Sequence, residues 1–232
     1  MEPLERLLDG NDDHVASLDA DHFADVRERQ TPEVASVSCS DSRMPTEGIW
    51  SAISDGDLFT GSNVGNQVWT DIDGDRVVTD TVGYAVAALG VDLVAVVGHT
   101  GCGAITAAYD VALGERGADT PAAVHAAVER LVPLVEVARA EGVVDADTPR
   151  REAVNRLVEY AVREQVEFLD VAAGVPADVA VAGFVYDFEA AYGGADGVAY
   201  LVSLDGETDA DRLRERLDPA FHAHVRSLLP PG

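Results

Sequence analysis

The sequence predicts an α/β protein in which a mostly parallel central β-sheet is flanked by helices, with an N-terminal helical arm and a C-terminal strand pair. Residues 34–38 and 93–97 have the length and composition of buried strands, and a helical segment precedes the second. This order favours parallel strands joined by right-handed crossovers. Residues 179–185 and 198–204 form the C-terminal strand pair. Without a linker-like change in composition, residues 1–232 are predicted to form one domain.

The arm is predicted to be helical over residues 2–30. Leucine, valine and phenylalanine recur there at helical spacing, and Pro32 ends the run. Such an arm packs either on its own domain or on a neighbouring subunit, and the sequence leaves both possibilities open. The strand that follows delivers Cys39 at its C-terminal end.

A loop with a short helix is predicted for residues 44–56. Residues 56–60 follow as a short strand, and the Gly/Asn-rich residues 61–66 form a turn in which backbone approaches a neighbouring group closely. We expect the side chain of Asp80 or Thr81 to cap the next helix. That helix runs to Leu89, with Gly90 in the stop position, and the strand that ends at His99 comes directly after it.

The second half of the chain predicts two long helices, residues 121–141 and 149–170. Pro133 is expected to kink the first helix, and Thr148 followed by Pro149 gives the second helix an N-cap and a first residue. Their apolar rows are predicted to face the core.

A connection over residues 187–197 is predicted to join the two C-terminal strands. Residues 209–217 are predicted as an exposed final helix that Thr208 caps. His222 and His224 then stand two positions apart, and we interpret them as part of a solvated tail rather than as metal ligands.

The charge is strongly negative: 42 acidic residues stand against 16 basic ones, for a net charge of −26, and every basic residue is arginine. Such a charge argues against nucleic acid or an anionic membrane as a partner. The acidic residues are dispersed along the chain. A dispersed acidic coat without lysine is typical of proteins from a salt-filled cytoplasm, where counter-ions screen the repulsion. The alternative is an ordinary acidic enzyme.

The expected location is the cytoplasm. The first residues are charged, so no signal peptide is expected, and no apolar run reaches the length of a membrane-spanning helix. In a chain of this kind the two cysteines favour metal binding over a disulfide.

Those two cysteines and one histidine predict a metal site. Cys39 and His99 each end a predicted strand, and Cys102 follows three residues after His99, near the start of a predicted helix. The carboxyl ends of parallel strands meet at one edge of a sheet, where ligands gather. Two thiolates and one imidazole are the ligands that catalytic Zn²⁺ takes when a fourth position is kept for water. The helix start favours the thiolate of Cys102.

Asp41 and Arg43 follow the first ligand on the same turn. A carboxylate fixed by a guanidinium can accept the proton of zinc-bound hydroxide and aim its lone pair at an electrophile. A structural turn pair is the alternative interpretation. A phosphatase loop is disfavoured, because that chemistry needs five residues between cysteine and arginine and three are present here.

These motifs resemble those of the β-class carbonic anhydrases, and the resemblance covers nearly the whole chain. The pattern is Cys-x-Asp-x-Arg followed by His-x-x-Cys, each closing a buried strand. Further shared motifs are Gly-Asp-Leu-Phe at 56–59, Asn-Val-Gly-Asn at 63–66, Tyr-Ala-Val at 84–86, Gly-His-Thr-Gly-Cys-Gly at 98–103 and Tyr-Asp at 186–187. The resemblance implies Cys39, His99 and Cys102 as zinc ligands and Asp41 with Arg43 as a catalytic dyad.

The resemblance also implies a substrate pocket of the plant-like branch, which keeps water as the fourth zinc ligand. Gln30, Phe59, Val64 and Tyr84 stand at its matching places. Taken without the family, the last three would be core residues and Gln30 the end of a helix. The chain departs from the family at Ser62, where arginine is usual, and in the long, Gly-rich connection over 187–197.

The activity implied by the resemblance is the reversible hydration of carbon dioxide to bicarbonate and a proton by zinc-bound hydroxide. The family builds on dimers whose pockets combine residues of both subunits, so a homodimer or a larger homo-oligomer is implied. Two alternatives remain at this point. One is a hydrolase of carbonyl sulfide or carbon disulfide on the same scaffold, and the other is a non-catalytic, zinc-stabilised binding protein.

Overall fold

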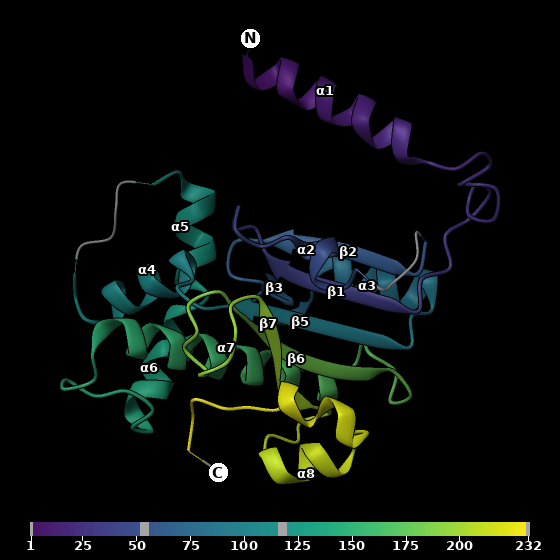
Figure 1. The fold of residues 1–232 in the computed structure, drawn as a ribbon. Coiled ribbons are helices and arrows are strands. Elements are labelled where there is room, and N and C mark those ends of the chain that lie inside the picture. The colour runs from purple at the N-terminus through teal and green to yellow at the C-terminus, as the bar shows by residue number, and fades with distance from the viewer. Residues whose placement is uncertain (1, 52–55, 116–119, 231–232) are drawn as a thin grey trace.

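The computed structural model describes residues 2–51, 56–115 and 120–230, and a five-stranded sheet forms its centre (Figure 1). The strand order is β2-β1-β5-β6-β7, with β7 antiparallel to β6 and the other pairs parallel. The strands are β1 (Val34–Cys39), β2 (Leu58–Asn63), β5 (Leu93–His99), β6 (Ala180–Asp187) and β7 (Val198–Leu204). The predicted α/β architecture with its C-terminal strand pair is confirmed, and the structure shows that this pair is antiparallel.

The sheet core is made by the apolar runs that the sequence indicated. In β1 and β5 every residue after the first is buried, as expected of strands covered on both faces. The longest helix, α7 (Arg150–Val171), packs against β5, β6 and β7 and buries twelve of its residues. The sheet and α7 therefore hold the carboxyl ends of the parallel strands in fixed positions.

The remaining helices surround this framework. They are α1 (Glu2–Ser17), α2 (Thr46–Ile49), α3 (Asp80–Tyr84) with a π-helical continuation (Ala85–Leu89), α4 (Gly103–Ala112), α5 (Ala122–Glu129), α6 (Val132–Ala140), α8 (Ala210–Glu215) and a 3₁₀ segment (Pro219–His224). Figure 1 shows α4, α5 and α6 gathered at one end of the molecule. Among the described residues, no helix has the length and apolar character needed to cross a membrane.

The N-terminal arm differs from the expectation in length and in packing. The helix ends at Ser17 rather than near residue 30, and turns follow it. None of the α1 residues is buried, and Figure 1 shows the helix standing apart from the body. Of the two packing possibilities, docking on its own domain is therefore not the one observed. The apolar stripe of α1, which we define as Leu4, Leu7, Leu8 and Val15, is exposed.

Three predicted helix N-caps were wrong by one or two residues. Thr79, not Asp80 or Thr81, caps α3, because its hydroxyl accepts a hydrogen bond from the Val82 amide. Gly90 ends the π-helical continuation in the left-handed conformation, with φ of 71°, as the stop signal predicted.

The other two caps also shift by one position. Pro149 is the N-cap of α7, and the Thr148 hydroxyl bonds to Asp145 instead. Asp209, not Thr208, caps α8 by accepting two backbone hydrogen bonds. A carboxylate offers a charged acceptor to the helix start, and this explains why the aspartate takes that place.

Pro133 separates two helices instead of kinking one. Residues 130–131 lie between α5 and α6, and Pro133 stands in the first turn of α6, where its missing N–H costs nothing.

A two-stranded hairpin, β3 (Trp69–Ile72) and β4 (Asp75–Val78), was not predicted. Its turn is Asp73-Gly74, with φ of 54° and 92°, and the Asp-Gly pair is a known signal for such turns.

Candidate metal centre

The three predicted ligands meet at the carboxyl edge of the sheet. Cys39 ends β1 and His99 ends β5, which is the neighbouring parallel strand, while Cys102 lies directly before α4. The two sulfur atoms are 3.9 Å apart, and the three ligand atoms lie within 4.8 Å of one another. All three side chains are buried. The described residues contain no other such group of histidine, cysteine or acidic side chains, so His222 and His224 are not part of one.

The imidazole of His99 is prepared to bind a cation through Nε2. Its Nδ1 lies 2.9 Å from the carbonyl oxygen of Thr100, which can only accept, so the proton is on Nδ1. The Nε2 atom is buried and has no hydrogen-bond partner. An unpartnered buried acceptor beside two thiols fits a Zn²⁺ ion, and this backbone-held orientation is usual for a zinc-ligating histidine.

The two thiols differ in acidity because each acts on the other. The hydrogen bond from Cys102, aided by His99 and by the Gly65 amide, lowers the pKa of Cys39 to about 4 against the opposing effect of burial. The hydrogen bond to Cys39 and burial raise the pKa of Cys102, although amides at the start of α4 act in the opposite direction. The predicted help from the helix start is therefore present but outweighed. Because thiols bind a metal ion as thiolates, a bound cation would displace protons from this pair.

Asp41 and Arg43 form a closed pair beside the ligands. The Nε and Nη2 atoms of Arg43 donate to the two carboxylate oxygens at 2.8 and 2.7 Å, and its backbone amide donates at 2.9 Å. These contacts hold the pKa of Asp41 well below its usual range, so the carboxylate is ionised at neutral pH. Its Oδ2 atom lies 3.7 Å from the Nε2 atom of His99. The carboxylate thus faces the place where the ligands converge.

Phe188 is a further neighbour that sequence reasoning missed. Its ring stacks on His99 at 5.6 Å between centroids, and the Arg43 guanidinium lies 4.5 Å from its centre on a cation–π contact. Phe188 follows β6, whose Tyr186 pairs with His99 in the sheet register. The phenylalanine has no motif of its own, and only the strand order of the sheet reveals its position.

Comparison with known proteins identifies the family. A model of the carbonic anhydrase family matches residues 34–192. The chain belongs to the carbonic anhydrase family. Carbonic anhydrase 2 of Mycobacterium tuberculosis is 29% identical over 185 residues, which cover 80% of this chain and 84% of the relative. The carbonic anhydrase of Mycolicibacterium smegmatis is 30% identical over 208 residues, covering 87% and 92%.

The fold agrees with the β class of carbonic anhydrases. A tetrameric β-carbonic anhydrase from the filamentous ascomycete Sordaria macrospora superposes with a TM-score of 0.65 at 26% identity. The match covers 81% of this chain and 93% of that structure. The class that the motifs resembled is therefore confirmed, and the Cys39, His99 and Cys102 cluster is typical of its zinc site.

The predicted pocket residues of this carbonic anhydrase lie on separate segments. Phe59 in β2 and Tyr84 at the end of α3 approach each other, with ring centroids 5.9 Å apart. Tyr84 and Val64 expose 50% and 37% of their surface, and Gln30 is exposed in the segment before β1. Phe59, Val64 and Tyr84 are therefore not the fully buried core residues that the sequence suggests without the family.

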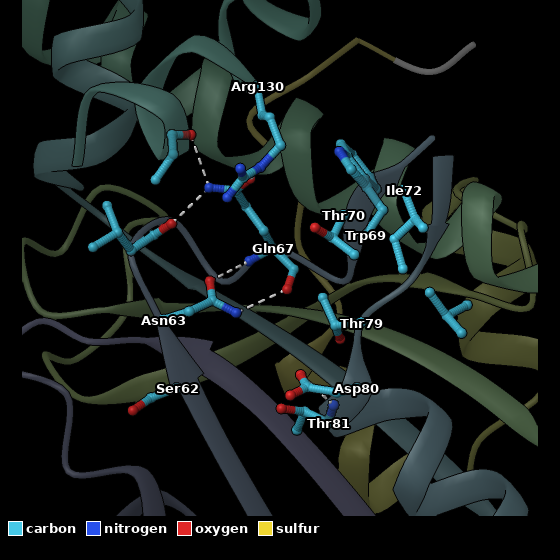
Figure 2. A pocket seen from close by; sticks show the side chains of 13 residues that line it. Ser62, Asn63, Gln67, Trp69, Thr70, Ile72, Thr79, Asp80, Thr81 and Arg130 are labelled. Carbon is cyan, nitrogen blue, oxygen red and sulfur yellow. Dashed lines mark hydrogen bonds between the residues drawn. The ribbon is translucent and has the colours of Figure 1, made fainter. Parts of the chain in front are cut away.

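A cavity of about 740 Å³ adjoins Val64 (Figure 2). Gln67 forms part of its wall, donating to the carbonyl oxygens of Val64 and Ala127 and accepting from Arg130 Nε at 2.8 Å. Ser62, which stands where the family usually has arginine, lines the same cavity. Arg130 lines this cavity as well. The three metal ligands do not line this cavity.

Proposed function

We propose that the metal centre catalyses the reversible hydration of carbon dioxide to bicarbonate and a proton. The observation that carries this proposal is the unpartnered Nε2 atom of His99, buried beside two thiols and 3.7 Å from the Arg43-held carboxylate of Asp41. Cys39, His99 and Cys102 would hold Zn²⁺. When bound with one position open, zinc supplies water of pKa near 7 as the nucleophile.

The protein's own groups would orient that water. An ionised Asp41 can only accept hydrogen bonds, and the fork of Arg43 prevents its carboxylate from turning. We assign Asp41 the role of accepting the water's proton in a hydrogen bond and Arg43 the role of holding Asp41. The fixed pair also keeps the carboxylate from becoming a fourth ligand, which supports an open site of the plant-like branch.

The substrate pocket is proposed to combine Gln30, Phe59, Val64 and Tyr84. Gln30 would donate a hydrogen bond to a substrate oxygen, and the other three would form a dry wall that favours the apolar CO₂ molecule. The family builds on dimers whose pockets combine residues of both subunits, so we propose that a second subunit completes this pocket.

Stopped-flow measurement of CO₂ hydration tests this function on zinc-loaded protein, with zinc-stripped protein as the control. We expect activity with zinc and its loss on stripping. Carbonyl sulfide and carbon disulfide are assayed in parallel. Turnover of either without CO₂ hydration would replace the proposed substrate, and full zinc occupancy without turnover of any of the three would favour a non-catalytic zinc protein.

The assembly is proposed to be a homodimer or a larger homo-oligomer in which α1 lies on the neighbouring subunit. The apolar stripe of α1 is exposed in a single chain, with Leu7 exposing 73% of its surface. Burying such a leucine contributes about 1.5 kcal/mol or more. The tetrameric relative from Sordaria macrospora supports an oligomer of some kind.

Leu7→Ser is therefore expected to weaken the assembly about tenfold, because about 1.4 kcal/mol corresponds to a factor of ten. The dissociation constant is measured by analytical ultracentrifugation. Asp9→Ser, an exposed change in the same helix outside the apolar stripe, is the matched control and should leave the constant unchanged. Equal constants for both variants and the wild type would remove α1 from the interface.

We also propose that the protein works in a cytoplasm of high salt. Of the described acidic residues only Glu159 and Asp187 are buried, so nearly all of the excess negative charge lies at the surface. The Debye length shortens from about 10 Å at 0.1 M salt to about 3 Å at 1 M. The two cysteines are free thiols, which a reducing cytoplasm preserves.

Stability is accordingly expected to rise with KCl between 0.1 and 2 M. A gain of about 2 kcal/mol would raise the melting temperature by roughly 4–8 °C for a chain of this length. Differential scanning calorimetry at a series of KCl concentrations measures the change. A melting temperature that stays flat or falls over this range would contradict the adaptation to salt while leaving the catalytic proposal intact.

A further inference from the structure

The turn between His99 and Cys102 is held from outside by one buried amide side chain. Gly101 occupies this turn with φ of 63°, and its backbone N–H donates to the Oδ1 atom of Asn155 at 2.8 Å. The carbonyl oxygen of Gly101 accepts from Nη2 of Arg43 at 3.3 Å. Gly101, within the ligand turn, therefore connects Asn155 on one side to Arg43 of the dyad on the other.

Asn155 is well placed to fix this turn. It lies on the second turn of α7 and exposes 3% of its surface. Its Nδ2 atom donates to Oε2 of Glu189 at 3.1 Å, and Arg151 donates to the same oxygen at 3.0 Å. Since the Gly101 amide can only donate and the Glu189 carboxylate can only accept, the orientation of the Asn155 amide is determined.

Glu189 completes the support around Gly101. A Cβ atom added to Gly101 would lie 3.0 Å from Oε1 of Glu189, so the carboxylate is packed directly against the turn. The backbone amide of Glu189 donates to the carboxylate of the buried Asp187 at 3.0 Å, and this hydrogen bond anchors the connection after β6. The ligand turn is thus fixed between α7 and this connection.

We propose that Asn155 is a positioning residue for the metal centre. Through Gly101 it fixes the spacing of His99 and Cys102 and the place at which Arg43 holds Asp41. Its side chain makes hydrogen bonds to Gly101 and Glu189 and acts on the metal ligands and the dyad through Gly101. A neutral amide suits this role because it must accept from a backbone N–H at one end and donate to a carboxylate at the other.

Asn155→Ala tests the proposal in zinc-loaded protein. Removing the acceptor frees the ligand turn, so a chelator such as EDTA should remove zinc about tenfold faster than from the wild type. Loss of a residue that orients metal ligands typically weakens metal binding by about this factor or more. The kcat for CO₂ hydration should fall about tenfold with little change in KM. Hydrogen exchange of the Gly101 amide, followed by NMR, should accelerate.

Gln165→Ala is the matched control. Gln165 is a fully buried amide on the same helix, and its Oε1 atom accepts from the backbone amide of Val68 at 3.0 Å. We expect this variant to lose thermal stability comparably while kcat and the zinc release rate stay within about twofold of the wild type. If Asn155→Ala changes kcat and zinc release no more than Gln165→Ala does, Asn155 only supports the fold and the proposal is wrong.

A second pair of variants preserves side-chain volume and carries the test should Asn155→Ala not fold. Asn155→Asp keeps an acceptor for Gly101 but sets a second carboxylate against Glu189, so the same losses are expected. Adding Glu189→Gln supplies a donor in place of the repelling oxygen and should recover at least half of the lost kcat. A double variant no better than Asn155→Asp alone would overturn the proposal.

The kcat measurements rest on the proposed function, whereas zinc release and Gly101 exchange do not. A wild-type protein that binds zinc without hydrating CO₂ would end the proposed function. The rates of zinc release and of Gly101 amide exchange, compared between Asn155→Ala and Gln165→Ala, would still decide the role of Asn155.

Discussion

Replacing His99 with alanine is expected to remove zinc from the protein and to lower the rate of CO₂ hydration by roughly 10³-fold or more. Zinc in enzymes is held by three protein ligands, and the variant keeps only the two thiols. A 10³-fold loss corresponds to about 4 kcal/mol at 1.36 kcal/mol per tenfold. Zinc content is measured by mass spectrometry on chelator-free protein, and the rate by stopped flow.

His125→Ala is the matched control for this variant. His125 is an exposed histidine on α5 that pairs with Glu129 at 3.2 Å and does not belong to the Cys39, His99 and Cys102 group. It should keep one zinc per chain and the wild-type rate. More than half a zinc per chain in His99→Ala, or a Cys39–Cys102 disulfide in the native wild type, would contradict the ligand set.

The ligand cluster and the contact between Asp41 and Arg43 could be predicted from the sequence because each motif is local. Cys39 and His99 end apolar runs, and parallel strands bring their carboxyl ends to one edge. Asp41 and Arg43 share one turn with Cys39, so their contact needs no long-range information. The same reasoning predicted that β1 and β5 are parallel and that Cys102 lies near the start of a helix.

The supporting residues could not be predicted because they arrive from distant segments. Asn155 reaches Gly101 from α7, and Phe188 and Glu189 come from the connection after β6. Their positions depend on how α7 packs on the sheet and on which strand lies beside β5. In the sequence, Asn155 is only a polar residue between the apolar rows of a long helix.

The arm was predicted too long because apolar spacing alone does not fix a helix end. Leucines at helical spacing indicate α1 correctly, but Asp19, Asp21 and their neighbours favour turns after Ser17. Most of the stability of a helix in a protein comes from packing of its apolar face. None of the α1 residues is buried in its own chain, so packing does not extend the helix past Ser17. The same missing contact is the reason for placing α1 against a neighbouring subunit.

Asp41→Asn should lower the hydration rate by roughly 10²-fold while zinc stays bound and the fold is kept. This loss equals about 2.7 kcal/mol of transition-state stabilisation. The carboxylate accepts from Arg43 at both oxygens, whereas an amide accepts at only one. If the NH₂ group faces Arg43, two donors oppose each other and the guanidinium no longer holds the side chain. If it faces the attacking water, it donates to the water's oxygen and misdirects the lone pair.

A purely structural role for Asp41 predicts a different result. The Asn side chain has the same size and still accepts from the Arg43 backbone amide, so stability would fall slightly and the rate hardly at all. Asp145→Asn provides the comparison, because the Asp145 carboxylate accepts backbone hydrogen bonds from Asp147 and Thr148 in a turn of the same kind. This control should show the small structural effect alone.

Arg43→Ala extends the test to the residue that holds the carboxylate. Without the guanidinium, Asp41 is free to turn toward His99 Nε2, from which its Oδ2 atom is separated by 3.7 Å, and to compete for the open zinc position. We therefore expect a loss similar to that of Asp41→Asn. Zinc content, circular dichroism and stopped-flow rates are measured together on both variants and on Asp145→Asn. Full zinc occupancy in Asp41→Asn with a rate within about threefold of the wild type, less than 1 kcal/mol, would remove Asp41 from the mechanism.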